Sequence, residues 1–141
     1  MRKSTAELLE ELQKTPGSLD EYLKNNASAF VQSDINAFWE GLIRRSGQSK
    51  SNIINKADIS YCYFYDVISG RKRPSRDKVV RLILAMRLSV EDCQRALTVA
   101  GKSSLYPRVK RDSIIIHAIE QHLSVFQLAE LLVKYGEEEL K

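Results

Sequence analysis

The stretch of residues 49–74, SKSNIINKADISYCYFYDVISGRKRP, constrains the fold more than any other part of the chain. Ser49 and Ser60 are of the type that caps helix N-termini, and each precedes a short run with an apolar face. Asp58 and Ile59 stand between the two runs as a turn. We therefore predict two short helices whose tight connection makes them cross steeply, with the second presented outward.

Apolar residues define the buried side of each predicted helix. They are Ile53, Ile54 and Ala57 in the first helix and Phe64 and Val67 in the second. Gly70 can adopt the left-handed conformation that ends a helix, because it has no Cβ to clash. Three consecutive cations, residues 71–73, then leave the helix end and are stopped by Pro74.

The net charge of +4 hides an uneven distribution along the chain. Residues 1–34 hold four Lys/Arg against six Asp/Glu (−2), residues 35–111 hold sixteen against six (+10), and residues 112–141 hold two against six (−4). A basic middle between acidic ends is typical of a module that binds a polyanion, with structural parts on both sides. The alternative is that the middle is only a solvated basic face.

Composition and cysteine spacing indicate the compartment. No apolar run approaches the roughly 20 residues that cross a bilayer, and the N-terminal MRKSTAELLEEL is amphipathic and acidic, unlike a secretory signal. Cys62 and Cys93 lack CxxC or Cys/His spacing, so we expect reduced thiols in a cytoplasmic protein. Cys62 beside cations is compatible with a redox switch, but a small residue tolerated near a groove is the simpler interpretation.

No motif predicts catalysis or a metal site. His117 and His122 are five residues apart, so they do not form the i, i+4 pair of a metal-binding helix. We expect His117 to be packed or to lie at the boundary of the core. Asp112, Glu120 and the acidic run 137–139 are interpreted as a helix cap and a solvated tail. We predict no enzymatic activity, no metal and no cofactor.

The first 33 residues predict a helical arm. Two pairs with capping-box spacing, Ser4 with Glu7 and Ser18 with Glu21, begin two amphipathic helices, and a Pro-Gly pair separates them. The arm is too short to fold alone, so we expect it to pack on the helices after it or to stay loosely attached.

Helix signals continue through the rest of the chain. Ser33 or Asp34 is expected to cap a longer helix with Arg44 and Arg45 in its last turn, where cations are favourable for the helix dipole. Further caps stand at Ser75 and Ser89. Glycines stand just past helical runs at positions 47, 70, 101 and 136. This punctuation predicts an all-α chain.

The sequence contains an internal echo at an offset of 35 residues. LSVEDCQRALTVAG (88–101) and LSVFQLAELLVKYG (123–136) share five of fourteen positions, and RDKVVRLILAM (76–86) aligns with RDSIIIHAIEQ (111–121). Duplication explains the echo, but capping chemistry alone can also make two hairpins alike. Under either explanation we expect an antiparallel helical pair that buries Ile114, Ile115, Ile119, Leu128, Leu131 and Leu132.

Residues 35–92 resemble the lambda-repressor-like (Cro/C1, XRE-type) helix-turn-helix family, without a gap from residue 49 to residue 75. The run that carries the resemblance extends from IS at 59–60 through F, V and SG to RKRPS. The resemblance implies a five-helix bundle whose second and third helices form the DNA-reading unit. With the flanking parts, it implies an N-terminal helical arm (1–33), a DNA-binding domain (34–101) and a C-terminal helical hairpin (102–141).

The resemblance also implies where DNA is contacted. The reading helix, residues 60–69, would enter the major groove, with base contacts from Tyr61, Cys62, Tyr65 and Asp66. Phosphate contacts would come from Ser49, Lys50, Ser69, Arg71 and Lys72, with Arg44 and Arg45 as additions. Lys50 stands where family members usually have glutamine, and lysine keeps the phosphate role as a point charge.

The base-contact positions depart from the family pattern. Gln, Arg, Asn, Ser or Thr are typical there, because they offer hydrogen bonds to base edges. YCYFYD offers phenol hydroxyls, a thiol and a carboxylate instead. The bidentate discrimination of about 1–3 kcal/mol per pair is therefore absent, which weakens sequence specificity more than affinity for the duplex.

We accordingly expect a DNA-binding transcriptional regulator of the repressor type, acting on double-stranded DNA as a dimer through residues 112–136. The alternative is a protein–protein adaptor that uses the tyrosine-rich face of the same helix, because tyrosine is favoured at interface hot spots.

Overall fold

The computed structural model describes residues 4–14, 19, 22–23 and 31–141, and their regular structure is entirely helical. The helices are α1 (Thr5–Lys14), α3 (Val31–Ser46), α4 (Lys50–Ala57), α5 (Tyr61–Ile68), α6 (Arg76–Met86), α7 (Val90–Val99), α8 (Lys110–Glu120) and α9 (Val125–Lys134). None of these described helices has the length and apolar character needed to cross a membrane. The all-α prediction is confirmed for this part of the chain, whereas the lambda-repressor-like arrangement stays a prediction.

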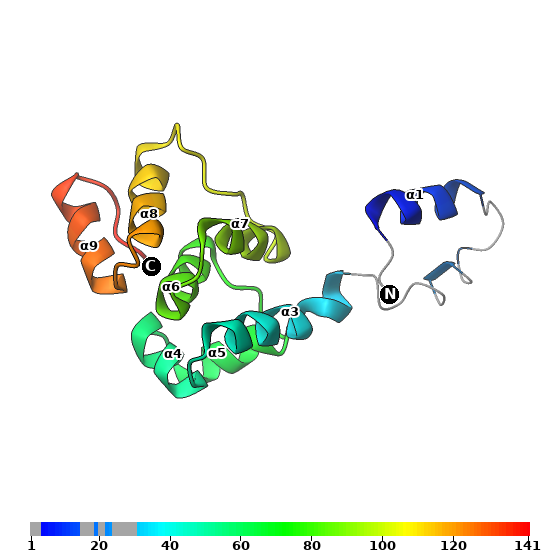
Figure 1. Ribbon diagram of the computed structural model, residues 1–141, viewed down its shortest axis with the longest axis horizontal. Coiled ribbons are helices and arrows are strands. Elements are labelled where there is room, and N and C mark those ends of the chain that lie inside the picture. Colours follow the sequence, from blue (N-terminus) through cyan, green and yellow to red (C-terminus); the bar gives the residue numbers. More distant parts are fainter. Residues whose placement is uncertain (1–3, 15–18, 20–21, 24–30) are drawn as a thin grey trace.

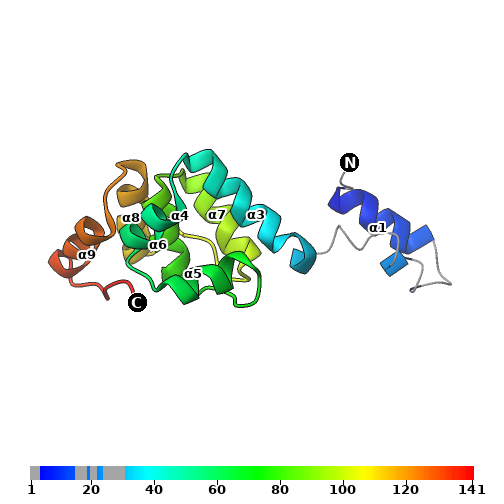
Figure 2. The ribbon, with the colours of Figure 1, turned by 90° about the horizontal axis from the view of Figure 1, so that it is seen from below.

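The N-terminal arm agrees with the sequence where it is described. The Ser4 hydroxyl accepts a hydrogen bond from the Glu7 backbone N–H at 3.1 Å, as expected for a cap. Figures 1 and 2 draw α1 apart from the other helices. The second predicted cap pair, Ser18 with Glu21, lies outside the described residues.

The predicted start of α3 is wrong. The helix begins at Val31, before the expected cap at Ser33 or Asp34. No glycine or proline interrupts the chain between Val31 and Asp34. Each residue added to an existing helix gains a backbone hydrogen bond, so a capping-type residue does not stop propagation.

One cluster of buried apolar side chains runs from α3 to the C-terminal tail. Its largest fully buried members include Trp39, Phe64, Leu82, Ile83, Leu97, Ile115 and Leu128. Helix α6 contacts α3, α4, α7, α8 and α9, so it is the central helix of the bundle (Figures 1 and 2). The cluster joins the predicted DNA-binding domain to the predicted C-terminal hairpin. Within that hairpin Ile115, Ile119, Leu128 and Leu132 are buried as predicted, and Ile114 and Leu131 are half-buried.

The hairpins α6–α7 and α8–α9 have the same backbone signals at the 35-residue offset. Ser89 and Ser124 each complete a capping box at the start of the second helix. Left-handed residues match as well: Arg87 and His122 have φ of 54° and 52°, and Gly101 and Gly136 have φ of 72° and 73°. The aligned sequences therefore fold into the same supersecondary unit.

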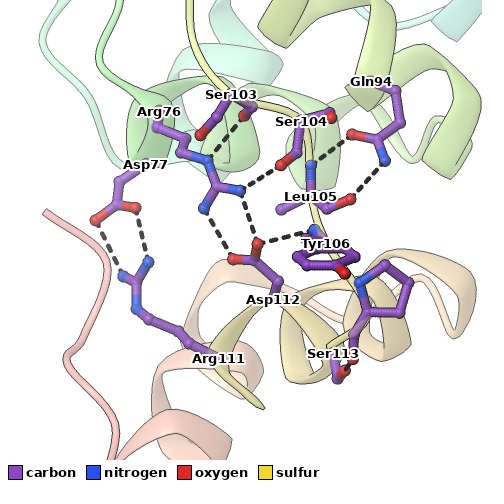
Figure 3. Close-up of polar contacts among 11 residues, drawn as sticks. Arg76, Asp77, Gln94, Ser103, Ser104, Leu105, Tyr106, Arg111, Asp112 and Ser113 are labelled. Carbon is purple, nitrogen blue, oxygen red and sulfur yellow. Dashed lines mark hydrogen bonds and ion pairs between the residues drawn. The ribbon is translucent and has the colours of Figure 1, made fainter. Parts of the chain in front are cut away.

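Two Arg-Asp dipeptides, residues 76–77 and 111–112, join the hairpins reciprocally (Figure 3). Arg76 of the first hairpin donates two hydrogen bonds of 2.8 Å to the Asp112 carboxylate of the second. Arg111 of the second donates two of 3.1 Å to the Asp77 carboxylate of the first. Such an exchange is the signature of a two-fold contact, here within one chain.

The segments that follow the two hairpins are contacted in the same reciprocal way. Arg76 donates to the carbonyls of Ser103 and Ser104, and Arg111 to those of Glu138 and Glu139. The Tyr106 N–H bonds Asp112, the Lys141 N–H bonds Asp77, and Leu105 and Leu140 are buried. Capping chemistry does not require any of these contacts. We therefore infer that the two hairpins are a duplicated unit.

Two predictions in this region are wrong. Asp112 is not the helix cap: Val109 stands at the N-cap of α8 without a side-chain cap, and Asp112 is only 3% exposed because Arg76 holds it between the hairpins. Burial raises the pKa of Asp112, but the Arg76 guanidinium and the Tyr106 N–H outweigh burial and lower it below its ordinary value. His117 is exposed rather than packed, because α8 turns this position away from α6 and towards solvent.

Candidate nucleic-acid interface

The first helix of the 49–74 stretch, α4, forms as its sequence predicts. The Ser49 hydroxyl accepts a hydrogen bond from the Asn52 N–H at 3.1 Å and caps the helix. Ile53, Ile54 and Ala57 are buried, and α4 packs on α6. Asp58 ends the helix in the left-handed conformation with φ of 55°, which aspartate tolerates better than most residues.

Helix α5 buries one side and leaves the other to solvent. The Ser60 hydroxyl caps it by accepting from the Tyr63 N–H at 3.1 Å. Phe64, Val67 and Ile68 are buried. The four predicted base-contact residues therefore share the opposite side, since they stand at i, i+1, i+4 and i+5. Tyr61 is 64% exposed and Cys62 is exposed, whereas Tyr65 and Asp66 are half-buried.

The tyrosines of this side form an ordered pair. The ring centroids of Tyr61 and Tyr65 are 4.6 Å apart, and the Tyr65 and Phe64 rings form a T-shaped contact with centroids 5.3 Å apart. Hydrogen bonding to Tyr65 raises the pKa of Tyr61 above its ordinary value. The pair presents aromatic surface with hydroxyl groups, and not the paired donors of an amide or guanidinium.

The predicted phosphate-contact residue Lys50 lies beside this pair. Its ammonium is 2.9 Å from the Glu40 carboxylate and 5.7 Å from the centre of the Tyr65 ring. By accepting a hydrogen bond, Glu40 raises the pKa of Lys50 above its ordinary value. The cation is thus held next to the outer side of α5.

A second cationic group lies at the C-terminal end of α5. Arg71 is exposed and reaches the Asp66 carboxylate at 3.4 Å, while the Ser69 hydroxyl bonds the Asp66 carbonyl and the Arg71 N–H. The Lys72 ammonium lies 5.2 Å from the centre of the Tyr63 ring. Arg73 points elsewhere, because its guanidinium lies against Gly101 at the end of α7. Arg71 and Lys72 therefore belong to the α5 surface.

Sequence reasoning missed Lys78. Its ammonium lies 5.7 Å from the same Tyr63 ring that Lys72 approaches. Burial, and then repulsion by Arg81, lower the pKa of Lys78 below its ordinary value. A signal was present in the sequence: Lys78 stands in the first turn of α6, where the helix dipole disfavours a cation.

Arg44 and Arg45 do not join this surface in the same way. Both lie in the last turn of α3 and are exposed, as predicted. Arg45, however, forms an ion pair with the buried Asp92 at the start of α7. Burial raises the pKa of Asp92, but Arg45 and Ser89 lower it below its ordinary value. Arg45 thus holds α3 to α7, and Arg44 stands exposed beside it.

The thiols and histidines form no further site in the described part of the chain. Cys62 is free and exposed, whereas Cys93 is free and buried, and burial raises the pKa of Cys93 to about 12. Among the described residues, no group of three or more His, Cys, Asp or Glu gathers as a metal ion would require.

No protein-family model, no curated protein and no solved structure matches this chain.

Proposed function

We propose that the chain is a DNA-binding regulator of the repressor type that lays the outer side of α5 into the major groove of a duplex. The observation that supports this most is the flanking of that side by cations. Lys50 lies beside the tyrosine pair, Arg71 at the C-terminal end of the helix, and Lys72 and Lys78 at the Tyr63 ring. Figures 1 and 2 both draw α5 at the edge of the bundle, away from α8 and α9.

Backbone contacts would supply most of the affinity. Each cation that neutralises a phosphate releases a counterion, so binding through four or more cations depends steeply on salt. The tyrosine pair would contact thymine methyl groups and offer single hydroxyls, so base discrimination would be modest. The proposed protein therefore binds many duplexes with similar affinity and prefers some of them weakly.

The test is the salt dependence of duplex binding, measured by fluorescence anisotropy of a labelled duplex. Replacing Lys50, Arg71 and Lys72 by alanine lowers the slope of log K against log salt by about three, or about one for each phosphate contact. The matched control replaces three exposed cations away from α5, namely Lys102, Arg108 and Lys134, and keeps the wild-type slope.

A second candidate function is supported by one observation, the aromatic pair on the outer side of α5. Tyr61 and Tyr65 lack bidentate donors, and tyrosine is favoured where proteins dock. In this reading α5 is an adaptor surface and its cations serve solubility. Absence of wild-type binding to any duplex at low salt would exclude the DNA proposal and leave the adaptor.

A further inference from the structure

Comparing the two hairpins shows which residues on the outer side of the second helix are required for folding. On α7 the exposed positions hold Glu91 and Thr98, and the half-buried Gln94 between them pairs its amide with the Leu105 backbone. At the equivalent positions α9 holds Phe126, Ala129 and Val133. Phe126 is 64% exposed and Val133 is 60% exposed. Since the first hairpin folds with polar residues at the two exposed positions, folding does not explain the exposed Phe126 and Val133 on α9.

The stripe borders two hollows that meet at Phe126. One hollow of about 400 Å³ lies between α4, α6 and α9, with Leu84 and Val125 among its apolar lining. The other, of about 360 Å³, continues along α9 past Ala129 and Val133. Together they form an open apolar groove, which we call the α9 groove, large enough to receive side chains of a second helix.

The charge of the larger hollow restricts what fits. The described residues that line it include Lys56, Arg87 and His122 and no aspartate or glutamate. An apolar floor with a cationic wall suits an amphipathic helix with acidic borders.

Helix α1 has this chemistry. Leu9 and Leu12 share one side of the helix and are 56% and 45% exposed. Residues 4–14 hold three glutamates and one lysine, and Glu7 stands in the first turn. The apolar stripe of α1 and the larger hollow of the α9 groove are thus exposed apolar surfaces of complementary charge, whereas Glu130 and Glu139 line the smaller hollow.

We propose that the α9 groove receives α1 of a second copy of this chain. Both views draw α1 and α9 at opposite ends of the molecule, so exchange between two copies brings them together (Figures 1 and 2). Each copy donates one helix and receives one, and the exchange closes as a two-fold dimer. This inference concerns a surface other than α5 and does not depend on DNA binding.

The test is the mass of the full-length protein by sedimentation equilibrium over a range of concentrations. The wild type is a dimer at micromolar concentration. The variant Leu9→Glu with Leu12→Glu loses the donated helix and dimerises at least about tenfold more weakly. The variant Phe126→Glu, Ala129→Gln and Val133→Thr loses the groove and weakens equally. These three substitutions introduce the residues that α7 holds at the equivalent positions, so the hairpin still folds.

Mixing the two variants distinguishes helix exchange from other dimers. The leucine variant keeps an intact groove, and the groove variant keeps an intact α1. Their mixture therefore forms a heterodimer held by one exchanged helix, which neither variant forms alone. Tyr106→Glu, a control on a 54% exposed aromatic outside the groove, stays a dimer like the wild type. Circular dichroism confirms that each variant is folded.

Three outcomes would overturn the proposal. A wild type that stays monomeric at hundreds of micromolar excludes exchange between copies. A leucine variant that remains a full dimer shows that the copies associate without α1, for example through α9 alone. Variants that do not complement each other in the mixture exclude α1 and the groove as partners.

Discussion

The hairpins α6–α7 and α8–α9 share a backbone but lie in opposite surroundings. α6 is covered by α3 and α4, whereas the same side of α8 faces solvent. At equivalent positions α6 buries Leu82, Ala85 and Met86, and α8 exposes His117, Glu120 and Gln121. The caps, the left-handed residues and the Arg-Asp joint are common to both. These local features therefore define the hairpin, whereas the residues on its outer sides differ according to the helices that pack on each hairpin.

The largest expected effect comes from exchanging one pair of equivalent residues. Leu82→His removes a fully buried side chain and places a polar ring in the core, so the free energy of unfolding falls by about 3–4 kcal/mol. The reverse change, His117→Leu, lies at an exposed position and alters it by less than about 0.5 kcal/mol. Urea unfolding of both variants measures the difference. Equal losses would show that the two positions have the same surroundings.

The reciprocal joint predicts unequal losses as well. Asp112→Ala removes a carboxylate that is 5% exposed, leaves the 24% exposed Arg76 without its partner, and lowers the free energy of unfolding by about 3 kcal/mol. Asp77→Ala costs about 1–2 kcal/mol, since the Asp77 side chain is 17% exposed against 5% for Asp112. Denaturant titration with the m-value monitored tests this order. A larger loss at Asp77 would contradict the burial of the two pairs.

Acidification should loosen the same joint, and the ion pair of Arg45 with Asp92, with a smaller effect. The pKa values of Asp77, Asp92 and Asp112 are lower in the folded chain than their ordinary values. The unfolded chain therefore binds protons at higher pH, and stability falls as the pH drops from about 4 towards the folded-state pKa values. Thermal melts between neutral pH and pH 3 record the decline. Asp112→Asn should flatten this pH dependence, and an unchanged slope would exclude Asp112 as a contributor.

Local chemistry explains which parts of the fold the sequence predicted. Ser49, Ser60 and Ser75 cap as expected, because a cap involves residues only three positions apart. Gly70 takes the left-handed conformation for the same local reason. Once Phe64 and Val67 are assigned to the core, the residues on the opposite side of α5 are predicted to be exposed.

Long-range pairing explains what the sequence did not predict. Asp112 looks like any acid in a first helical turn, and its partner Arg76 is 36 residues away. The repeated Arg-Asp dipeptide was visible, but its reciprocal exchange requires the two hairpins to face each other. Lys50 with Glu40 and Arg45 with Asp92 are likewise contacts between helices that no spacing rule reveals.

The reciprocal exchange between the Arg-Asp dipeptides has a consequence for the growth of the fold. Helical units of this length often stack head to tail into open solenoids, where each new unit adds to a free end. Here the joining residues of each unit are paired with those of the other unit, so the two units form a closed pair. A third unit would find neither an unpaired arginine nor an unpaired aspartate at this joint, so the array ends at two.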